Sequence, residues 1–142
     1  LSLVGSEMCI RDSSYVCLDQ QYSRVNTPQS VLELAQSCNH GNLQDHELKL
    51  RLHRALFGQQ MWDKRCDTLS GGERMRLCLC SLMIANHVPD LFVLDEPTNN
   101  LDLSSLAILT RTVRNYRGTL LVVSHDGHFT DQIGITRTVE LE

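Results

Sequence analysis

The stretch that decides the fold runs from residue 69 to residue 102, and it begins with Leu-Ser-Gly-Gly-Glu at 69–73. It ends with Leu-Phe-Val-Leu-Asp-Glu-Pro-Thr-Asn-Asn-Leu-Asp at 91–102. Ser70 and Glu73 have the S-x-x-E spacing of a capping box, so we expect a helix to begin there and to stop before Pro89. The continuous apolar run at 91–94 is typical of a strand buried on both faces. The stretch therefore predicts a helix followed by a buried strand.

The chain before this stretch predicts a strand and a helical subregion. Residues 15–18 are apolar and suit a short strand. Thr27 and Pro28 fit a helix start, with Thr27 as the N-cap and Pro28 in the first helical position. Apolar residues then recur near helical spacing up to Gly58, which we expect to end a helix. Residues 28–66 are therefore predicted to be helical, ahead of a core at 67–142.

The chain after this stretch predicts alternating helices and strands. We expect Asp102 to cap a helix whose inner face starts at Leu103, and Gly118 to end that helix. A second buried strand is expected at 119–123, a short helix near Phe129 and a last strand at 135–141. This alternation predicts an α/β fold with a mostly parallel sheet.

The composition is that of an ordinary globular chain. Of 142 residues, 42% are hydrophobic and 21% are charged, which argues against wholesale disorder. The net charge of −4 gives no strong attraction to nucleic acid or anionic lipid, so we expect no DNA partner. No apolar run approaches the roughly 20 residues of a membrane span, so we expect no membrane insertion. The 6 cysteines lack metal-binding spacing, which favours buried free thiols in a reducing compartment.

Polar side chains follow two of the predicted strands. Asp95 and Glu96 come directly after the strand at 91–94, and His125 follows the strand at 119–123. Ligands of open parallel sheets bind beyond the carboxyl ends of the strands. One carboxylate would suit the shell of a Mg²⁺ ion and the other would position an attacking water. Taken alone, however, Asp95-Glu96 before Pro97 fits a simple turn equally well.

The segment Ser70-Gly71-Gly72 is a candidate anion site. Glycines let a backbone approach phosphate closely, and the start of a helix favours negative charge. The alternative is a capped loop with no ligand. For this tripeptide in isolation, the capped loop is the better interpretation.

The order of the motifs narrows the interpretation. Leu-Ser-Gly-Gly-Glu at 69–73, the strand ending in Asp95-Glu96, Asn-Asn-Leu-Asp at 99–102 and His125 occur in the order found in ATP-binding cassette (ABC) ATPases, which the chain resembles. Glu-Pro-Thr-Asn-Asn-Leu-Asp and Val-Ser-His-Asp-Gly-His-Phe-Thr-Asp resemble the ABC-F subfamily. Asn100 and Thr130 depart from its usual His and Leu. The resemblance implies a partial P-loop NTPase fold with a helical subdomain.

The resemblance assigns catalytic and metal roles to four residues. Glu96 would act as general base or position the attacking water, and His125 would contact and sense the γ-phosphate. Asp95 would support Mg²⁺, and Gln20 would reach both the metal and the water. The cofactors implied are ATP and Mg²⁺. Outside the resemblance, His125 fits a hydrogen-bonded histidine at a strand end and Gln20 fits a solvated loop residue.

In the family, Leu-Ser-Gly-Gly-Glu is the signature motif. The resemblance implies that this motif, at 69–73, binds the nucleotide held by the opposite cassette. Ser70, Gly71 and Gly72 would bind its γ-phosphate, with Glu73 in the same motif. Asp102 would couple the two sites across the interface. The implied partners are a second cassette, in cis or in trans, and the ribosome. The resemblance implies a cytoplasmic protein that acts on the ribosome, either as a translation factor or as a protein that protects the ribosome and confers antibiotic resistance.

One motif of the family is missing from the sequence. No G-x-x-x-x-G-K-[ST] loop is present, although it would cradle the β- and γ-phosphates. Residues 1–13 match no family motif, and we interpret them as a foreign leader ahead of a partial ABC domain at 14–142. We therefore expect this chain alone to be inactive.

Two rival hypotheses remain, a nucleotide-binding subunit of a membrane transporter and a truncated fragment without catalysis.

Overall fold

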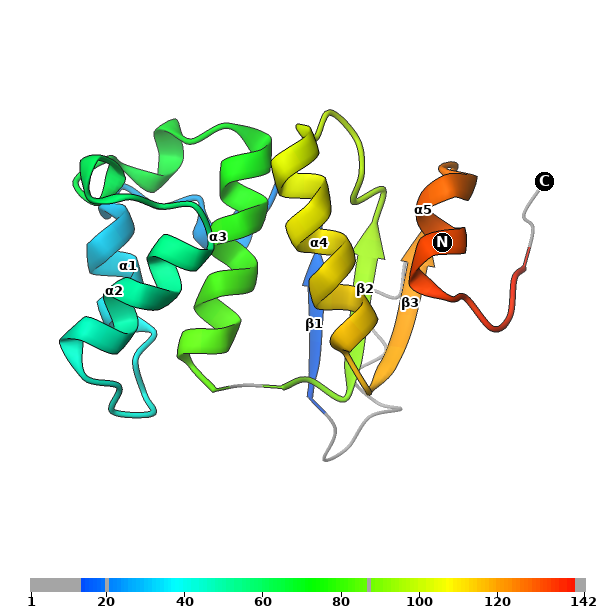
Figure 1. Cartoon of the computed structure of the whole chain (residues 1–142), viewed down its shortest axis with the longest axis horizontal. Helices are drawn as coiled ribbons and strands as arrows, with labels where there is room; N and C mark the ends of the chain where they lie inside the picture. The colour runs from blue at the N-terminus through cyan, green and yellow to red at the C-terminus, as the bar shows by residue number, and fades with distance from the viewer. Residues whose placement is uncertain (1–13, 20, 87, 140–142) are drawn as a thin grey trace.

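The computed structural model describes residues 14–19, 21–86 and 88–139. Its sheet contains β1 (Tyr15–Leu18), β2 (Leu91–Asp95) and β3 (Thr119–Val123) in the order β1-β2-β3. All pairs are parallel, and Leu94 of β2 lies in register between Leu18 and Val122. The carboxyl ends of the strands therefore point the same way (Figure 1). The prediction of an α/β fold with parallel strands is confirmed.

Helices connect the strands and form a separate cluster beside the sheet. The helices are α1 (Val31–Ser37), α2 (Asp45–Arg54), α3 (Gly71–Ile84), α4 (Leu103–Asn115) and α5 (Gly127–Ile133), with 3-10 turns at Ser23–Val25, Gln59–Met61 and Cys66–Thr68. In Figure 1, α3 runs between the cluster of α1 and α2 and the sheet, and it contacts α1, α2 and α4. Helix α3 is therefore the element that joins the helical subregion to the sheet.

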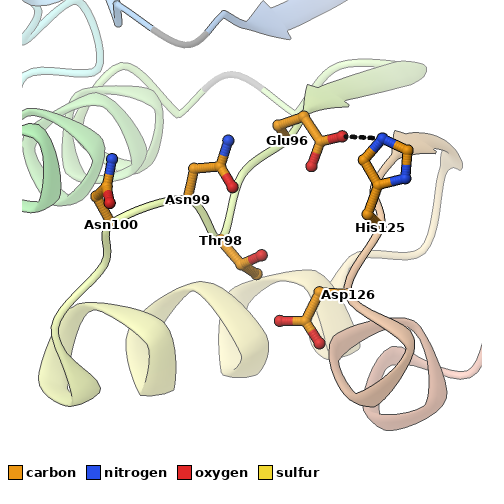
Figure 2. A pocket seen from close by; sticks show the side chains of 6 residues that line it. All are labelled: Glu96, Thr98, Asn99, Asn100, His125 and Asp126. Carbon is orange, nitrogen blue, oxygen red and sulfur yellow. Dashed lines mark ion pairs between the residues drawn. The ribbon is translucent and has the colours of Figure 1, made fainter.

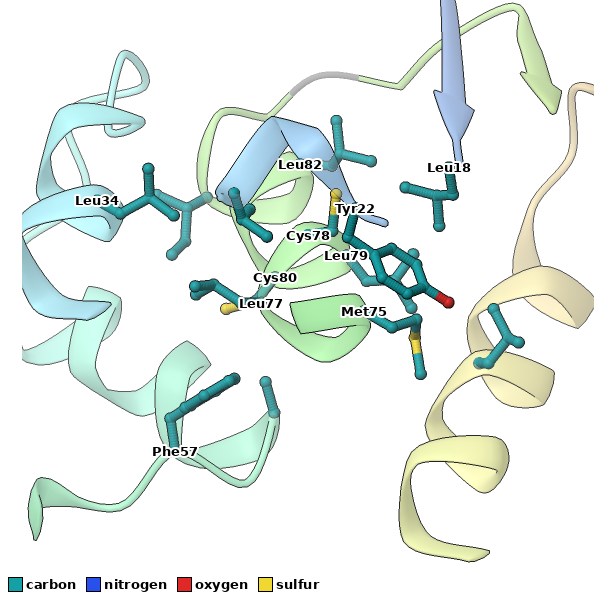
Figure 3. Close-up of a cluster of buried hydrophobic side chains, with 14 of the residues drawn as sticks. Leu18, Tyr22, Leu34, Phe57, Met75, Leu77, Cys78, Leu79, Cys80 and Leu82 are labelled. Atoms are coloured by element: carbon teal, nitrogen blue, oxygen red, sulfur yellow. The ribbon is translucent and has the colours of Figure 1, made fainter. Parts of the chain in front are cut away.

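The core is centred on α3. Met75, Leu77 and Cys78 have no exposed surface, and they pack with side chains from β1, α1 and α2 (Figure 3). Each such aliphatic side chain contributes about 1.5–3 kcal/mol when it is removed from water. Burial raises the pKa values of Cys78 and Cys80 to about 12, so both are neutral thiols. These two fit the prediction of buried free thiols.

Strands β1 and β2 are buried on one face only, and β3 has no buried residue, which corrects the predictions that β2 is covered on both faces and that the strand at 119–123 is buried. Phe92 and Leu94 are buried against the helices, whereas Leu91 and Val93 are half-buried. In β1 the alternation is sharper, because Val16 and Leu18 are buried while Tyr15 and Cys17 are exposed. Cys17 therefore departs from the prediction of buried thiols. The cause is that the described helices pack on one side of these strands.

The first helix begins later than predicted. The residue that caps α1 is Ser30, whose hydroxyl accepts a hydrogen bond from the Glu33 amide at 3.1 Å. Thr27 is not the cap. The carbonyl of Thr27 accepts from the Asp67 amide, and the next residues pair with the chain around Arg65. These hydrogen bonds keep residues 27–30 out of a helix, so the helix starts only after Ser30.

The second helix ends earlier than predicted. Helix α2 stops at Arg54, and Leu56 adopts the left-handed conformation with φ 68°. The Phe57 amide donates to the Leu52 carbonyl at 2.8 Å, and the Leu56 amide donates to His53. This is a Schellman motif with leucine in the position that glycine usually takes. The prediction that Gly58 ends the helix is therefore wrong.

Three predictions near the C-terminus also need correction. Leu103, expected on the inner face of α4, is 85% exposed. Helix α4 ends at Asn115, so Gly118 is not its terminator. Residues 135–139 form no strand, because no strand of the described sheet hydrogen-bonds to them, and residues 140–141 lie outside the described residues.

No helix in the described part of the chain is long and apolar enough to cross a membrane.

Candidate functional site

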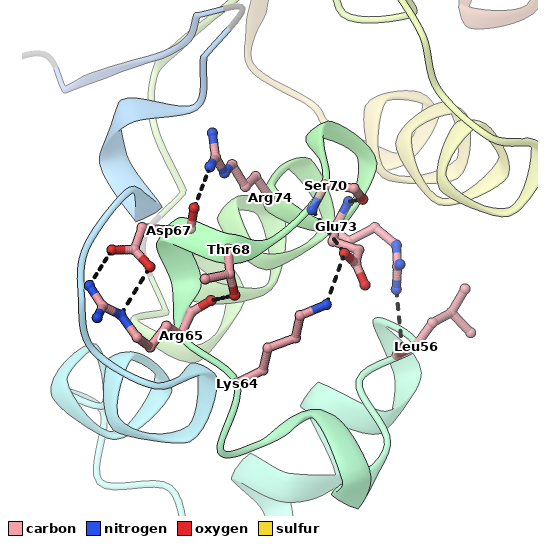
Figure 4. A network of polar contacts seen from close by, with 9 residues as sticks. Leu56, Lys64, Arg65, Asp67, Thr68, Ser70, Glu73 and Arg74 are labelled. Carbon is pink, nitrogen blue, oxygen red and sulfur yellow. Dashed lines mark hydrogen bonds and ion pairs between the residues drawn. The ribbon is translucent and has the colours of Figure 1, made fainter.

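The start of α3, residues 70–73, is called here the signature end. The Ser70 hydroxyl accepts from the Glu73 amide at 3.2 Å, and Glu73 Oε1 accepts from the Ser70 amide at 2.9 Å (Figure 4). This reciprocal pair confirms the predicted capping box. It satisfies one amide of the first helical turn and fixes where the helix starts.

The capping glutamate is ionised more easily than an ordinary glutamate. Burial raises the pKa of Glu73, but hydrogen bonds from Ser70 and the positive charge of Lys64 outweigh burial and lower it. Lys64 Nζ lies 3.9 Å from Glu73 Oε1, and the Glu73 side chain is 20% exposed. The signature end therefore carries a fixed negative charge that stabilises the start of the helix.

The two glycines of the signature end have different surroundings. A Cβ built on Gly72 would lie 2.7 Å from Asp102 Oδ1 and 2.9 Å from Ser105 Oγ. A Cβ built on Gly71 would meet no atom within 4 Å. Gly72 is thus required by the close approach of α4, whereas Gly71 leaves its backbone open to an approaching ligand.

A buried arginine ties α3, the signature helix, to α2 and α4. Arg76 is 8% exposed. Its guanidinium donates to the carbonyls of Ala55 and Leu56 at 2.8 and 3.2 Å, and to Ser105 Oγ at 3.1 Å. Ser105 in turn donates to Asp102 Oδ1 at 2.6 Å. Because each member has a partner, this network fixes Asp102 against the signature helix.

Asp102 also caps α4, as the sequence predicted. Its Oδ2 accepts from the Ser105 amide at 3.2 Å. The hydrogen bond from the Ser105 hydroxyl is the main reason that the pKa of Asp102 is lowered. Sequence reasoning missed Arg76 and Ser105. The available signal was an arginine inside the otherwise apolar run of α3.

The second part of the site, called here the acidic edge, comprises Asp95, Glu96 and His125 at the carboxyl ends of β2 and β3. Asp95 is the last residue of β2. Glu96 adopts a positive φ of 47°, which is uncommon for a residue with a side chain. Its amide donates to the Val123 carbonyl at 2.7 Å, and this bond holds the turn against β3.

Glu96 and His125 face each other across a cleft. His125 Nε2 lies 3.3 Å from Glu96 Oε1, and the cleft has a volume of about 370 Å³ (Figure 2). The Glu96 side chain is 14% exposed, whereas that of His125 is 97% exposed. A half-buried carboxylate of this kind can orient a water molecule. The exposed imidazole beside it can contact an anion that arrives from solvent.

Four further residues line this cleft and were not among the predicted site residues. They are Thr98, Asn99, Asn100 and Asp126. Their signal was their place within the motifs that follow β2 and β3. Asp126 also caps α5, because its Oδ1 accepts from the Phe129 amide at 3.1 Å.

The structure brings some of the predicted residues together and leaves others apart. Glu96 and His125 share the cleft, and Asp102 lies over Gly72 of the signature end. The signature end does not line the cleft, although α3 and α4 both begin at the side to which the strands point (Figure 1). Gln20 lies outside the described residues.

The donor set of the acidic edge fits a magnesium ion only in part. Among the described residues, no three His, Cys, Asp or Glu side chains cluster tightly enough to hold a metal by themselves. Magnesium in nucleotide sites is held by one or two carboxylates and completed by phosphates and waters. Asp95 and Glu96 at the end of β2 supply carboxylates of that kind.

Comparisons with known proteins give the class. The family model described as "ABC transporter" matches residues 6–99. The energy-dependent translational throttle protein EttA of Haemophilus influenzae is 36% identical over 121 residues, which is 84% of this chain and 21% of that protein. The chain therefore belongs to the ABC family of ATP-binding cassettes, with a partial P-loop NTPase fold.

Two further matches refine this assignment. ABC transporter F family member 5 of Arabidopsis thaliana is 42% identical over 96 residues, 68% of this chain and 13% of that protein. The resemblance to the ABC-F subfamily is thereby confirmed. The archaeal ribosome recycling factor aABCE1, solved with the ribosomal stalk protein aP1, matches with a TM-score of 0.63 and 25% identity over 87% of this chain and 24% of that one. The chain spans about a fifth of the length of the throttle protein.

Proposed function

We propose that this chain is part of a longer protein that binds and hydrolyses ATP between two cassettes. The observation that carries the proposal is the 3.3 Å contact between Glu96 and His125 in the cleft at the ends of β2 and β3. Parallel sheets bind their ligands at this edge. The family to which the chain belongs consists of ATP-binding cassettes.

In the proposed mechanism, Glu96 orients the attacking water and accepts its proton. Its backbone is held by the bond to Val123, so the carboxylate keeps a fixed direction. His125, which is exposed, contacts the γ-phosphate and stabilises charge on it. Asp95 would hold Mg²⁺ together with Gln20, and the bound ion would neutralise charge on the phosphates.

The signature end would bind the nucleotide held by the opposite cassette. The start of α3 favours an anion, and Gly71 leaves room for close approach. Ser70 and Glu73 keep this turn in place through the capping box. Asp102 would report the state of one site to the other, because it is joined to the signature helix through Ser105 and Arg76.

Steady-state ATP turnover tests this proposal, measured on the longer protein of which this chain is proposed to be part, called the full-length parent. We expect Glu96→Gln to lower turnover about 100-fold or more, because a general base typically contributes 10²–10⁴-fold. The matched control is Glu47→Gln, an exposed residue of α2 outside the site. Equal turnover in both variants would overturn the role given to Glu96.

We further propose that the parent acts on the ribosome in the cytoplasm. The support is that one relative is named a translational throttle protein and that another was solved with a ribosomal stalk protein. Co-sedimentation of the parent with ribosomes tests this. We expect the Glu96→Gln variant with ATP to pellet with ribosomes and to remain in the supernatant with ADP. A nucleotide-independent distribution would contradict the proposal.

The finer role, protection of the ribosome from antibiotics, is a separate proposal for the same parent. It predicts that deletion of the parent gene lowers the minimum inhibitory concentration of ribosome-targeting drugs. Unchanged inhibitory concentrations together with altered translation would favour a translation factor.

A further inference from the structure

A second, larger concavity lies away from the acidic edge. It has a volume of about 870 Å³ and is lined by residues of α2, α3 and α4 and of the segment that follows α3; we call it the α2–α4 groove. Figure 1 shows α2 and α4 on either side of α3. Residues of α3, among them Leu79 and Met83, contribute to the floor of the groove. Asn86, Val88 and Pro89 line it beyond the end of α3, so it extends to the end of α3 opposite the signature end.

The floor of the α2–α4 groove is apolar and partly exposed. Leu79, Met83 and Ile108 line it. Met83 is 54% exposed, and Val88, which also lines the groove, is 73% exposed. Large apolar side chains that gather in a concave, open surface mark interaction sites in soluble proteins. Methionine suits such surfaces because it adapts its shape to a partner.

The rim of the groove is positively charged. Arg51, Arg54, Arg111 and Arg117 line it, and no Asp or Glu is among its lining residues. Within residues 14–19, 21–86 and 88–139, none of these four arginines forms an ion pair. The chain as a whole carries a net charge of −4, so this concentration of positive charge is local. An apolar floor between basic walls is complementary to an amphipathic helix with acidic flanks.

We propose that the α2–α4 groove docks an acidic amphipathic helix of a partner protein. The apolar face of that helix lies on Met83 and its neighbours, and its Glu or Asp residues face the arginines. An RNA strand would use the arginines but would leave the exposed aliphatic side chains without a matching surface, because nucleic acids bind proteins through phosphate contacts and through stacking of bases on aromatic rings. The two aromatic residues that line the groove are engaged within the fold, since Phe92 is buried and packs edge-on against Tyr116, whose hydroxyl donates to the Pro89 carbonyl. The groove does not include the residues of the acidic edge, so a docked helix leaves Glu96 and His125 uncovered, although Arg76 of α3 is among the residues that line it.

Fluorescence anisotropy with synthetic peptides and the full 142-residue chain tests this proposal. The probe is a labelled 16-residue helical peptide with Leu and Met at positions i, i+4, i+7 and i+11 and with Glu at the flanking positions. The first control peptide carries Lys in place of every Glu, and the second is a scrambled peptide of identical composition. We expect the Glu peptide to bind at least about tenfold more tightly than either control, and to bind more weakly as salt is raised.

Variants of the groove locate the binding site. We expect Met83→Glu, and Arg54→Glu combined with Arg111→Glu, each to weaken binding of the Glu peptide about tenfold. Arg114→Glu and Leu103→Glu are the matched controls, since both residues are exposed on α4 and do not line the groove. The double arginine variant should also gain affinity for the Lys peptide. Circular dichroism confirms that each variant keeps the helix content of the unmodified chain.

Three results would overturn the proposal. The first is equal binding of the Glu peptide and its scrambled form. The second is an equal loss of affinity in the groove variants and in their α4 controls. The third is a 12-nucleotide RNA that binds more tightly than the Glu peptide and is lost in the same double arginine variant, which would make the groove a nucleic-acid site.

Discussion

The signature end and the acidic edge are built in different ways. At the signature end, the first turn of α3 is held by a capping box, by a glycine under α4 and by a buried arginine network. At the acidic edge, Glu96 stands on a turn with positive φ and faces an exposed histidine. The first depends on packing of three helices, whereas the second depends on one turn at the end of the sheet.

Because of this difference, substitutions in the two regions should affect stability and activity differently. Substitutions at the signature end remove contacts that the fold itself uses, so they should lower stability and activity together. Substitutions of Glu96 or His125 remove few buried contacts, so they should lower activity with little effect on folding. The following predictions test this contrast.

The largest loss of stability is expected from Arg76→Met. Methionine fills much of the same volume but leaves the carbonyls of Ala55 and Leu56 and the hydroxyl of Ser105 without their donor. We expect the free energy of unfolding in urea to fall by about 2–4 kcal/mol. Arg114→Met, an exposed change on α4, should stay within about 0.5 kcal/mol. Similar values for the two variants would mean that the hydrogen-bond network of Arg76 does not stabilise the fold.

The next largest effect is expected from Gly72→Ala. The added methyl would press on Asp102 and Ser105 and should cost about 1–3 kcal/mol. Gly71→Ala is the matched control, because its methyl meets nothing and alanine favours the helix by up to about 1 kcal/mol. Urea unfolding of both variants measures the contrast. If Gly71→Ala were the more destabilising variant, the division between the two glycines would be wrong.

A smaller effect is expected when the cap is removed. Ser70→Ala loses the acceptor for the Glu73 amide and should lower the free energy of unfolding by about 0.5–2 kcal/mol. Ser104→Ala, at an exposed position in the first turn of α4, should be neutral or slightly stabilising. Thermal denaturation followed by circular dichroism gives both values. No difference between these serines would mean that the cap does not hold the signature end.

The smallest effect is expected in the pH dependence of stability. Since the pKa of Glu73 is lowered on folding, its contribution is complete above its unfolded pKa and is lost as the pH falls through the folded value. We therefore expect the stability difference between the unmodified chain and Glu73→Gln to shrink between about pH 6 and pH 3. Urea midpoints at several pH values measure it. A difference that grows as the pH falls would contradict the lowered pKa.

The sequence predicted features that depend on neighbouring residues. The capping box of Ser70 and Glu73 and the cap of Asp102 depend on spacings of three residues, and the strands depend on short apolar runs. Such local signals are complete within the chain segment itself. The closeness of Glu96 and His125 was predictable from one rule of topology. Parallel strands present their carboxyl ends at the same edge of the sheet.

Features that depend on distant residues were not predictable in the same way. Ser30 replaces Thr27 as a cap because residues far along the chain hydrogen-bond to Thr27 and keep it out of the helix. Leu56 takes a position that favours glycine, where burial of Phe57 and the hydrogen bond from Arg76 support the turn. The burial of β2 on one face depends on which helices pack against the sheet. Each outcome is decided by tertiary contacts rather than by local pattern.

The central claim, that Glu96 promotes hydrolysis, is tested most directly by identifying the nucleotide that the protein retains. The full-length parent with Glu96→Gln is incubated with Mg²⁺ and ATP and is then freed of unbound nucleotide. We predict that this variant retains ATP, whereas Glu47→Gln and the unmodified protein release ADP after turnover. Retention of ADP as the main nucleotide by Glu96→Gln would contradict the account.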